Sequence, residues 1–147
     1  MKIFFASQSF YPNVGGVSTY LLNLARGLIQ RGNEVVEVHL RPPNESSEEL
    51  INGIKVFRIP KEPLKEELLK GYSNFKERIY KECHGEGEFF KKEPLITYGY
   101  DEYHQINLSL GKQIEELLEK NPTEVVHIHD FQFLLIYSVK SFFRQRN

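Results

Sequence analysis

The first 40 residues combine a continuous apolar run with two periodic patterns. Ile3 to Ala6 is apolar throughout, which suits a strand covered on both faces in a parallel sheet. From Val17 to Ile29 apolar residues recur every three or four positions, which predicts an amphipathic helix that Gly32 closes. Glu34 to Leu40 is rich in valine and predicts a second strand. Together these segments form one βαβ unit.

The same alternation continues beyond this unit. Arg41 to Glu49 is polar and predicts an exposed loop, whereas Gly53 to Ile59 alternates and predicts a third strand. Tyr103 to Lys120 has helical periodicity, Glu124 to His129 predicts a last strand, and Phe131 to Arg144 predicts a final helix. Strands that alternate with helices indicate an α/β fold, with a Rossmann-like parallel sheet and flanking helices.

Residues 61–102 interrupt this order. The segment is too long for a plain loop in a compact domain, and we expect short helical pieces around Glu66 to Cys83. We interpret it as an insertion near the site, within a single domain that spans residues 1–147. Its aromatic residues suit either the packing of a small subdomain or a flat platform for an acceptor sugar. They are Tyr72, Phe75, Tyr80, Phe89, Phe90, Tyr98, Tyr100 and Tyr103.

Composition narrows the functional classes. A length of 147 residues and 40% hydrophobic content suit one domain with its own core. The net charge of -1 gives no reason to expect nucleic acid as a partner. Cys83 is the one cysteine, so no internal disulfide can form, and we expect a reducing, cytoplasmic location. No apolar stretch approaches the roughly 20 residues of a transmembrane helix.

The loop after the first strand carries paired glycines, Gly15 and Gly16, directly before a helix. Such glycines let the backbone approach a ligand, and a helix N-terminus offers free N–H groups to a phosphate. The turn can equally be a tight entry into the helix, with Gly16 or Ser18 as its cap. The dinucleotide motif G-x-G-x-x-G and the P-loop are both absent, which argues against a simple NAD enzyme. We expect no cofactor.

The second unusual segment is the strand that ends in His127, His129 and Asp130. Side chains alternate along a strand, so the two histidines share one side. We interpret His127 as a core histidine, whereas His129 lies nearer the crevice where ligands bind in such sheets and could contact a sugar hydroxyl. Two such imidazoles can also bind a metal, but no further ligand has metal-site spacing, so we expect none.

Four motifs in order resemble the family 4 glycosyltransferases, which include glycogen synthases, mannosyltransferases and trehalose synthases. The resemblance covers both ends of the chain and hardly the middle. The motifs are Phe10-Tyr11-Pro12 with Gly15-Gly16-Val17, Gly32-Asn33-Glu34-Val35, Asn52-Gly53-Ile54-Lys55-Val56, and Val125-Val126-His127-Ile128-His129-Asp130. Asn33 stands where the family often has histidine.

The resemblance implies a GT-B fold, in which two Rossmann-like domains face each other across a cleft. It implies that Gly15 and Gly16 approach the diphosphate of a nucleotide-sugar donor, that His129 contacts the transferred sugar, and that Asp130 lies beside it. Tyr11 and Asn13 are candidates for contact with the acceptor. The family transfers its sugar with retention of configuration and without a metal. The proposed route is front-side attack by the acceptor hydroxyl, whose proton passes to the leaving diphosphate.

One departure and three alternatives remain. The C-terminal domain that grips the donor in this family is absent from the 147 residues, so we expect the isolated chain to have little or no activity. The chain can instead be a sugar- or phosphate-binding module, or one subunit of a split transferase. A nucleotide-sugar 2-epimerase would require further carboxylates at the strand ends for acid–base chemistry, and Asp130 is the one obvious candidate. A receiver-type domain would require an acidic cluster after the first strand, where this chain has Ser7-Gln8-Ser9.

Overall fold

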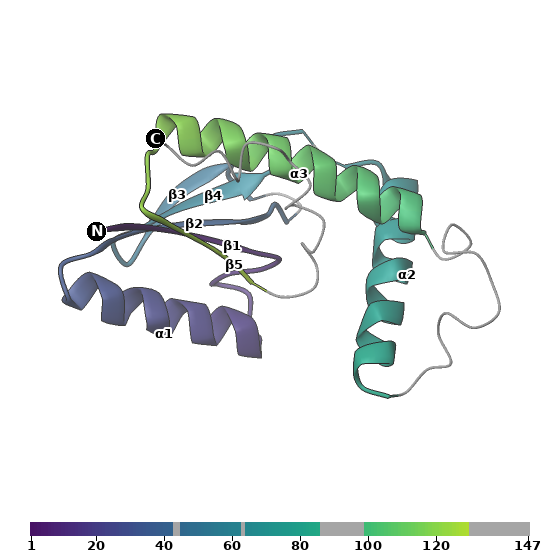
Figure 1. The fold of residues 1–147 in the computed structure, drawn as a ribbon, viewed down its shortest axis with the longest axis horizontal. Coiled ribbons are helices and arrows are strands. Elements are labelled where there is room, and N and C mark those ends of the chain that lie inside the picture. Colours follow the sequence, from purple (N-terminus) through teal and green to yellow (C-terminus); the bar gives the residue numbers. More distant parts are fainter. Residues whose placement is uncertain (43–44, 63, 86–98, 130–147) are drawn as a thin grey trace. The chain divides into compact units, whose positions relative to one another are not determined.

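A computed structural model describes residues 1–42, 45–62, 64–85 and 99–129 of the chain. The elements follow the order β1 (Lys2–Ser7), α1 (Gly16–Gln30), β2 (Glu34–Leu40), β3 (Glu48–Ile51), β4 (Ile54–Ile59), α2 (Glu66–Cys83), α3 (Tyr100–Lys120) and β5 (Val125–Ile128). They form two compact units (Figure 1). The first contains the sheet, α1 and the end of α3 from Gln113, and the second contains α2 and the rest of α3.

Within the described residues, the first unit is built on a five-stranded sheet with the order β3-β4-β2-β1-β5. β1, β2, β4 and β5 run parallel, and β3 alone is antiparallel to its neighbour β4. The expected α/β class is therefore confirmed, with one antiparallel strand at the edge. Because four strands share a direction, their carboxyl ends meet at one edge of the sheet, where ligands bind in folds of this kind.

Helix α1 covers one face of the sheet because its apolar stripe matches the apolar positions beneath it (Figure 1). Leu21 and Ala25 are fully buried, and each large apolar side chain buried in this way contributes about 1.5–3 kcal/mol. The helix ends at Gln30 with Arg31 as its C-cap, so Gly32 is not the cap itself but the next residue, whose φ of 79° is one that glycine adopts without strain. The sheet residues below α1 are Ile3, Phe5, Val35, Ile51, Ile54 and Val56.

The hairpin of β3 and β4 corrects the expectation of a loop up to Glu49, because β3 begins at Glu48. Its two strands join at Asn52 and Gly53, whose φ angles are 51° and 81°. Two consecutive residues with positive φ form the turn that matches the twist of an antiparallel pair. The Asn-Gly dipeptide was therefore the signal for a strand on each side of it.

In the second unit, α2 is one continuous helix rather than the short pieces expected, within the same bounds. Tyr72 and Tyr103 stack with ring centroids 5.6 Å apart, and Phe75 lies 5.0 Å from Tyr103. All three side chains are buried, so these aromatics pack the unit. Phe89, Phe90 and Tyr98 lie outside the described residues, as does the expected helix Phe131 to Arg144.

A prediction follows from Gly99, at the start of α3. Its φ is 87°, and a Cβ there would overlap the carbonyl oxygen of Gly71 in α2. We expect Gly99→Ala to lower the free energy of unfolding by about 2–4 kcal/mol, because backbone strain and a backbone clash add. Gly85→Ala is the matched control, since Gly85 has a φ of 71° but a Cβ there would meet no described atom within 4 Å. Urea unfolding of both variants tests this, and equal losses would exclude the clash.

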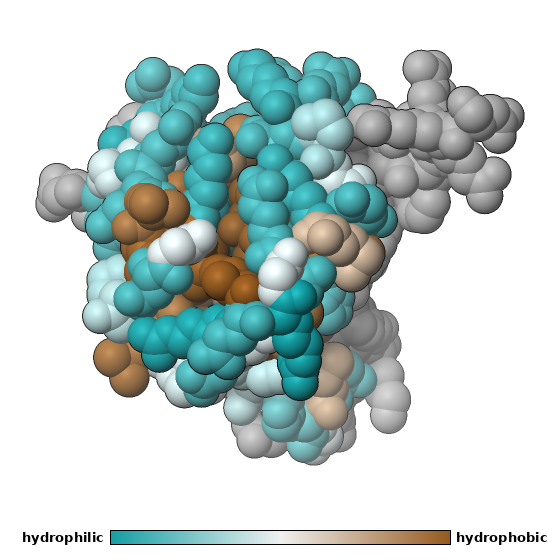
Figure 2. Space-filling view, turned by 90° about the vertical axis from the view of Figure 1, so that its left-hand side faces the viewer, coloured by the Kyte–Doolittle hydropathy of each residue, from teal (hydrophilic) through white to brown (hydrophobic). Residues whose placement is uncertain are grey.

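The surface at the end where the chain begins is mixed in polarity. Figure 2 shows hydrophobic residues in the middle of this face, surrounded by hydrophilic ones. Met1 is among the exposed large hydrophobic residues, at 62%. Among the described residues, no helix combines the length and the apolar character needed to cross a bilayer.

Candidate functional site

A row of polar side chains crosses the sheet at its carboxyl edge, on the face that α1 covers. Ser7 of β1 is in register with His39 of β2, and His39 with Arg58 of β4. All three are buried. His129 extends the row beyond β5, because its backbone N–H donates to the carbonyl oxygen of Ala6 at 2.8 Å. The sheet therefore places four polar side chains where parallel sheets bind their ligands.

His129 is half-buried at one end of this row. Its ring makes edge contacts with Phe5, 5.4 Å away, and with Tyr20 of α1, 6.1 Å away. The ring of His127 lies 4.1 Å from that of His129, so the expectation that the two histidines share one side is confirmed. Contacts from a strand and a helix thus fix the orientation of His129.

His127 is exposed, so its interpretation as a core histidine is wrong. The reason is the place of β5, which lies at the edge of the described sheet. Val125 and Val126 on the same strand are also exposed, at 40% and 36%. Asp130, the other candidate on this segment, lies outside the described residues.

The paired glycines lie where nothing in the described chain requires glycine. Gly15 has a φ of 176°, extended backbone that any residue adopts. A Cβ placed on Gly15 or on Gly16 would meet no atom within 4 Å. Gly15 is the N-cap of α1, no side chain caps the helix, and its first turn has no acidic residue. The expectation of Gly16 or Ser18 as the cap is wrong, because both residues lie within the helix. The open space and the helix entry together can admit an anionic group.

The loop between β1 and α1 is anchored by Phe10, which is completely buried. The backbone N–H of Asn13 donates to the carbonyl oxygen of Phe10 at 3.1 Å and closes a turn. Tyr11 is 45% exposed, and Asn13 is exposed as well. Both acceptor candidates are therefore accessible to a ligand at the same edge of the sheet.

Sequence reasoning missed two ionisable residues of β2, Glu37 and His39. Burial raises the pKa of Glu37 well above its ordinary value, although a 2.5 Å hydrogen bond from the Ser7 hydroxyl opposes this. Burial, together with the positive charge of Arg58, lowers the pKa of His39 to about 3. The imidazole of His39 is therefore neutral at physiological pH, and burial favours the protonated form of Glu37. The sequence did contain a signal for this burial. Glu37 and His39 alternate with other residues along β2 and so lie on the same face as the buried Val35.

These shifts predict opposite pH dependences of stability. The raised pKa of Glu37 makes the folded state hold a proton that the unfolded state releases above its ordinary pKa of 4.5, so stability falls as pH rises. The lowered pKa of His39 makes the unfolded state take up a proton below 6.5, so stability falls as pH falls. Between these two pH values the two slopes oppose each other in the parent chain.

Two variants separate the slopes. In the Glu37→Gln variant only the His39 effect should remain. The free energy of unfolding should then rise by about 1.4 kcal/mol for each unit that the pH rises through this window. His39→Leu should give the reverse slope. Urea unfolding at intervals from pH 4.5 to 6.5 measures both. A flat profile in both variants would contradict the assignment.

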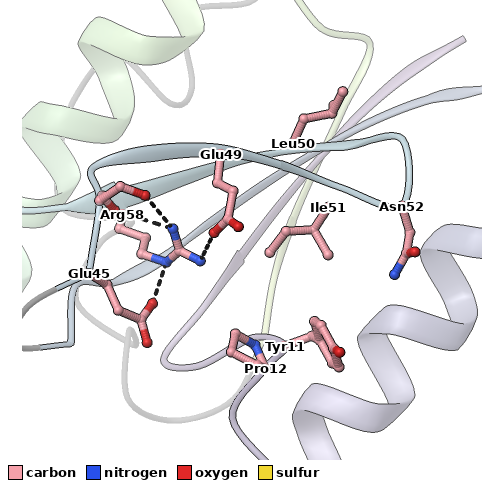
Figure 3. A pocket seen from close by; sticks show the side chains of 9 residues that line it. Tyr11, Pro12, Glu45, Glu49, Leu50, Ile51, Asn52 and Arg58 are labelled. Carbon is pink, nitrogen blue, oxygen red and sulfur yellow. Dashed lines mark hydrogen bonds and ion pairs between the residues drawn. The ribbon is translucent and has the colours of Figure 1, made fainter.

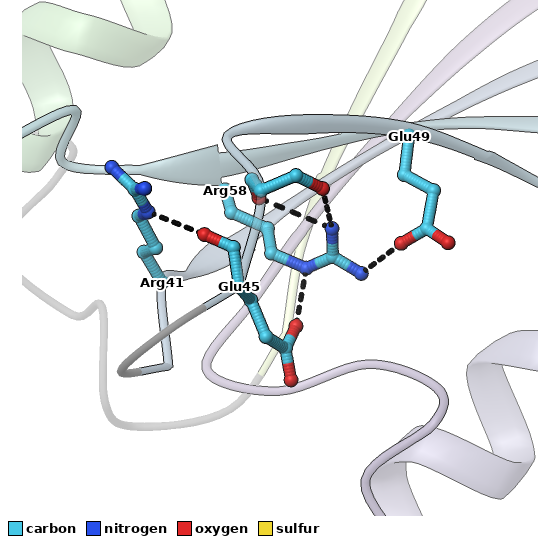
Figure 4. A network of polar contacts seen from close by, with 5 residues as sticks. Arg41, Glu45, Glu49 and Arg58 are labelled. Carbon is cyan, nitrogen blue, oxygen red and sulfur yellow. Dashed lines mark hydrogen bonds and ion pairs between the residues drawn. The ribbon is translucent and has the colours of Figure 1, made fainter.

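Arg58 organises the far end of the row (Figure 4). Its side chain is 1% exposed, and its Nε and Nη2 each lie 2.7 Å from a carboxylate oxygen, of Glu45 and Glu49 respectively. Its Nη1 donates to the carbonyl oxygen and the hydroxyl of Ser46, at 3.2 and 3.3 Å. Nη1 and Nη2 make hydrogen bonds, whereas Nε lies at ion-pair distance from Glu45 without hydrogen-bond geometry, so both carboxylates compensate the buried positive charge. Arg58 therefore fixes the segment before β3 to the end of β4.

A hollow of about 530 Å³ opens beside this network (Figure 3). Tyr11 and Pro12 from the β1–α1 loop form one wall, and Glu49 and Ile51 of β3 form the opposite one. Glu45 and Arg58 close a third side. Among the described residues, no three His, Cys, Asp or Glu side chains are arranged to share a metal ion.

Comparison with known proteins identifies the family. The sequence profile of Glycosyltransferase Family 4 matches residues 14–145, which is most of the chain. The chain belongs to glycosyltransferase family 4. The match also spans residues 61–102, where the sequence motifs had indicated little likeness. The resemblance drawn from the four motifs is thereby confirmed.

Individual relatives of this family 4 chain agree with that assignment. A human protein, named as a subunit of phosphatidylinositol N-acetylglucosaminyltransferase, is 37% identical over 60 residues, which are 40% of this chain and 12% of the relative. The UDP-forming α,α-trehalose-phosphate synthase from Burkholderia vietnamiensis superposes with a TM-score of 0.68 and 15% identity, over 96% of this chain and 30% of that one.

A second solved structure has the same fold. The E. coli structure described as trehalose-6-phosphate bound with UDP-2-fluoro glucose gives a TM-score of 0.64 at 16% identity, over 97% of this chain and 30% of that one. Likeness at such low identity shows the fold, which is that of GT-B glycosyltransferases. The family 4 chain therefore spans about a third of the length of these solved chains and matches their N-terminal part.

Proposed function

We propose that this chain is the N-terminal part of a GT-B transferase that moves a sugar from a nucleotide-sugar donor to an acceptor hydroxyl with retention of configuration. The observation that carries the proposal is the pair Gly15 and Gly16. Neither a close contact nor a backbone angle in the described residues requires glycine at these two positions. Both lie at the N-terminus of α1. The space beside them is what a donor diphosphate would need.

The proposed roles follow from placement at the carboxyl edge of the sheet. Gly15 and Gly16 let the donor diphosphate approach the backbone N–H groups of α1. His129, held by Phe5 and Tyr20, orients the transferred sugar and stabilises the positive charge that develops on it. Asp130 follows directly in sequence and is proposed to lie beside the same sugar.

The chemistry needs no protein base in this proposal. The acceptor oxygen forms a bond to the anomeric carbon on the face from which the diphosphate oxygen departs. The acceptor proton passes to that departing oxygen, and no metal is required. Tyr11 and Asn13, which are exposed on the β1–α1 loop, are proposed to contact the acceptor.

The rest of the enzyme is also a proposal. We place residues 1–147 in one N-terminal domain, with residues 61–102 as an insertion, which faces a C-terminal domain that holds most of the donor. A solved neighbour described with a UDP sugar supports a nucleotide-sugar donor, and the human relative, which is named for its place in a multi-subunit enzyme, supports an assembly with partners. We propose a cytoplasmic location and little or no turnover by the isolated 147-residue chain.

The natural protein that contains this chain tests the function. Incubation with a panel of UDP-, GDP- and ADP-sugars and mixed sugar acceptors should give transfer in the presence of EDTA, and proton NMR should show a product with the anomeric configuration of the donor. An inverted product would overturn retention. Absence of both transfer and donor hydrolysis, with sugar binding by the 147-residue chain, would favour the non-catalytic binding module instead.

A further inference from the structure

The hollow between the β1–α1 loop and β3 lies beside the proposed donor site but is formed by other residues. Its wall begins at Tyr11, four residues before Gly15 in the same loop. The opposite wall comes from β3, the strand that sequence reasoning missed. A ligand in this hollow would therefore use the same loop as a donor held at the glycine pair, but other residues of it.

The hollow offers hydrogen-bond acceptors. The guanidinium of Arg58 has few free hydrogen-bond donors for a ligand, because its Nε, Nη1 and Nη2 already contact Glu45, Ser46 and Glu49 respectively. In each glutamate one oxygen contacts Arg58, and the other oxygen has no partner among the described residues. Two carboxylates and one guanidinium give the hollow an excess of one formal negative charge. A matching ligand would donate hydrogen bonds and would carry no negative charge.

The opposite wall offers a flat apolar surface. The ring of Tyr11 is 45% exposed and stands beside the ring of Pro12 (Figure 3). Aromatic rings present a broad apolar face together with a polar tip. An aromatic face opposite paired carboxylates suits a sugar ring, whose C–H face is apolar and whose hydroxyl groups donate hydrogen bonds.

We propose that this hollow binds the acceptor, and that the acceptor is an uncharged, hydroxyl-rich sugar rather than a sugar phosphate. The proposal rests on the transferase function above and narrows its substrate class. Glu45 and Glu49 accept hydrogen bonds from acceptor hydroxyls, Tyr11 packs on the ring, and Arg58 holds both glutamates in place. The solved neighbours are named for trehalose phosphate, so this hollow would distinguish the chain from them in acceptor charge.

Binding without a donor tests the proposal. Saturation-transfer NMR on the full chain would compare D-glucose, D-mannose, D-galactose, maltose and myo-inositol with D-glucose 6-phosphate and D-mannose 6-phosphate. We expect at least one uncharged sugar to bind about ten-fold more tightly than its own phosphate. Equal or tighter binding of the phosphates, or binding of no uncharged sugar, would overturn the proposal.

Variants locate the binding. Glu49→Gln and Tyr11→Ala should each weaken binding of the uncharged sugar by about ten-fold, as expected for a lost charged hydrogen bond or ring contact. Glu48→Gln is the matched control, because Glu48 pairs with Phe57 whereas Glu49 pairs with Val56, so the two glutamates point to opposite faces of the sheet. Tyr11→Ala removes a partly exposed side chain, and its melting temperature should match that of the parent. Equal affinity in all four proteins would place the sugar elsewhere and refute the assignment.

A charge exchange separates this proposal from the transferase function. The double variant Glu45→Gln, Glu49→Gln leaves Arg58 without an anionic partner. The relative affinity of the hollow should then shift toward sugar phosphates by about ten-fold or more. An unchanged preference would count against the hollow as the acceptor site. If the parent chain prefers uncharged sugars but the natural protein transfers no sugar, the donor chemistry would be refuted. The hollow would then remain a sugar-binding site.

Discussion

Alanine at Gly15 or Gly16 is expected to reduce sugar transfer about 100-fold or more, with no loss of folding stability. The two effects separate because a Cβ at either position meets no atom of the described residues within 4 Å. Alanine should even stabilise the fold slightly, since it restricts the unfolded chain. The added methyl group would occupy the space proposed for the diphosphate, and a displacement of about 1 Å can cost 100-fold in rate.

Gly27→Ala is the matched control in the same helix. A Cβ there would lie 3.9 Å from Nη1 of Arg31, an ordinary contact, so the variant should be more stable by about 1 kcal/mol and fully active. The measurement combines kcat/KM of the natural protein with its urea unfolding curve. Full activity in Gly15→Ala and Gly16→Ala would show that the glycine pair is only a tight entry into α1.

Replacement of His129 by alanine is expected to lower kcat about 100- to 1000-fold, as does removal of one group that stabilises charge in a transition state. The ring is half-buried and oriented by Phe5 and Tyr20, so it is held before the donor arrives. Its role on the transferred sugar predicts an effect on kcat larger than the effect on the KM of the donor. Steady-state kinetics of the natural protein measure both.

His127→Ala provides the comparison on the same strand. His127 is exposed and its ring lies 4.1 Å from that of His129, so its loss removes one neighbour without removing the proposed sugar contact. We expect less than a ten-fold change in kcat. His129→Asn, which keeps a hydrogen-bonding group, should recover part of the activity. Equal losses in His127→Ala and His129→Ala would assign both residues to the support of β5.

The order of elements could be predicted from sequence because each has a clear period. The valine run of β2 and the apolar stripe of α1 gave their bounds almost to the residue. The strand β3 was missed because its four residues, Glu-Glu-Leu-Ile, carry little strand propensity of their own. It forms because the turn at Asn52 and Gly53 returns the chain beside β4.

The candidate site was only partly accessible to sequence reasoning. The glycine pair and His129 could be identified as candidates from motifs, because each lies directly after a predicted strand or before a predicted helix in the sequence. The network of Arg58 with Glu45 and Glu49 was hidden, since it depends on the register of β4 with β2 and on the antiparallel return of β3. Exposure of His127 was mispredicted for a similar reason. An apolar strand looks the same in sequence whether it lies inside a sheet or at its edge.

Two groups among the described glycines differ in what the fold requires of them, and this difference has an evolutionary consequence. Gly32, Gly53 and Gly99 have positive φ angles, so the fold itself constrains them. Gly15 and Gly16 meet no such requirement. A descendant that lost catalysis but kept the fold would be under pressure to retain the first kind and free to replace the second. Side chains at positions 15 and 16 in otherwise similar sequences would then mark lineages in which the transferase has become a pseudoenzyme.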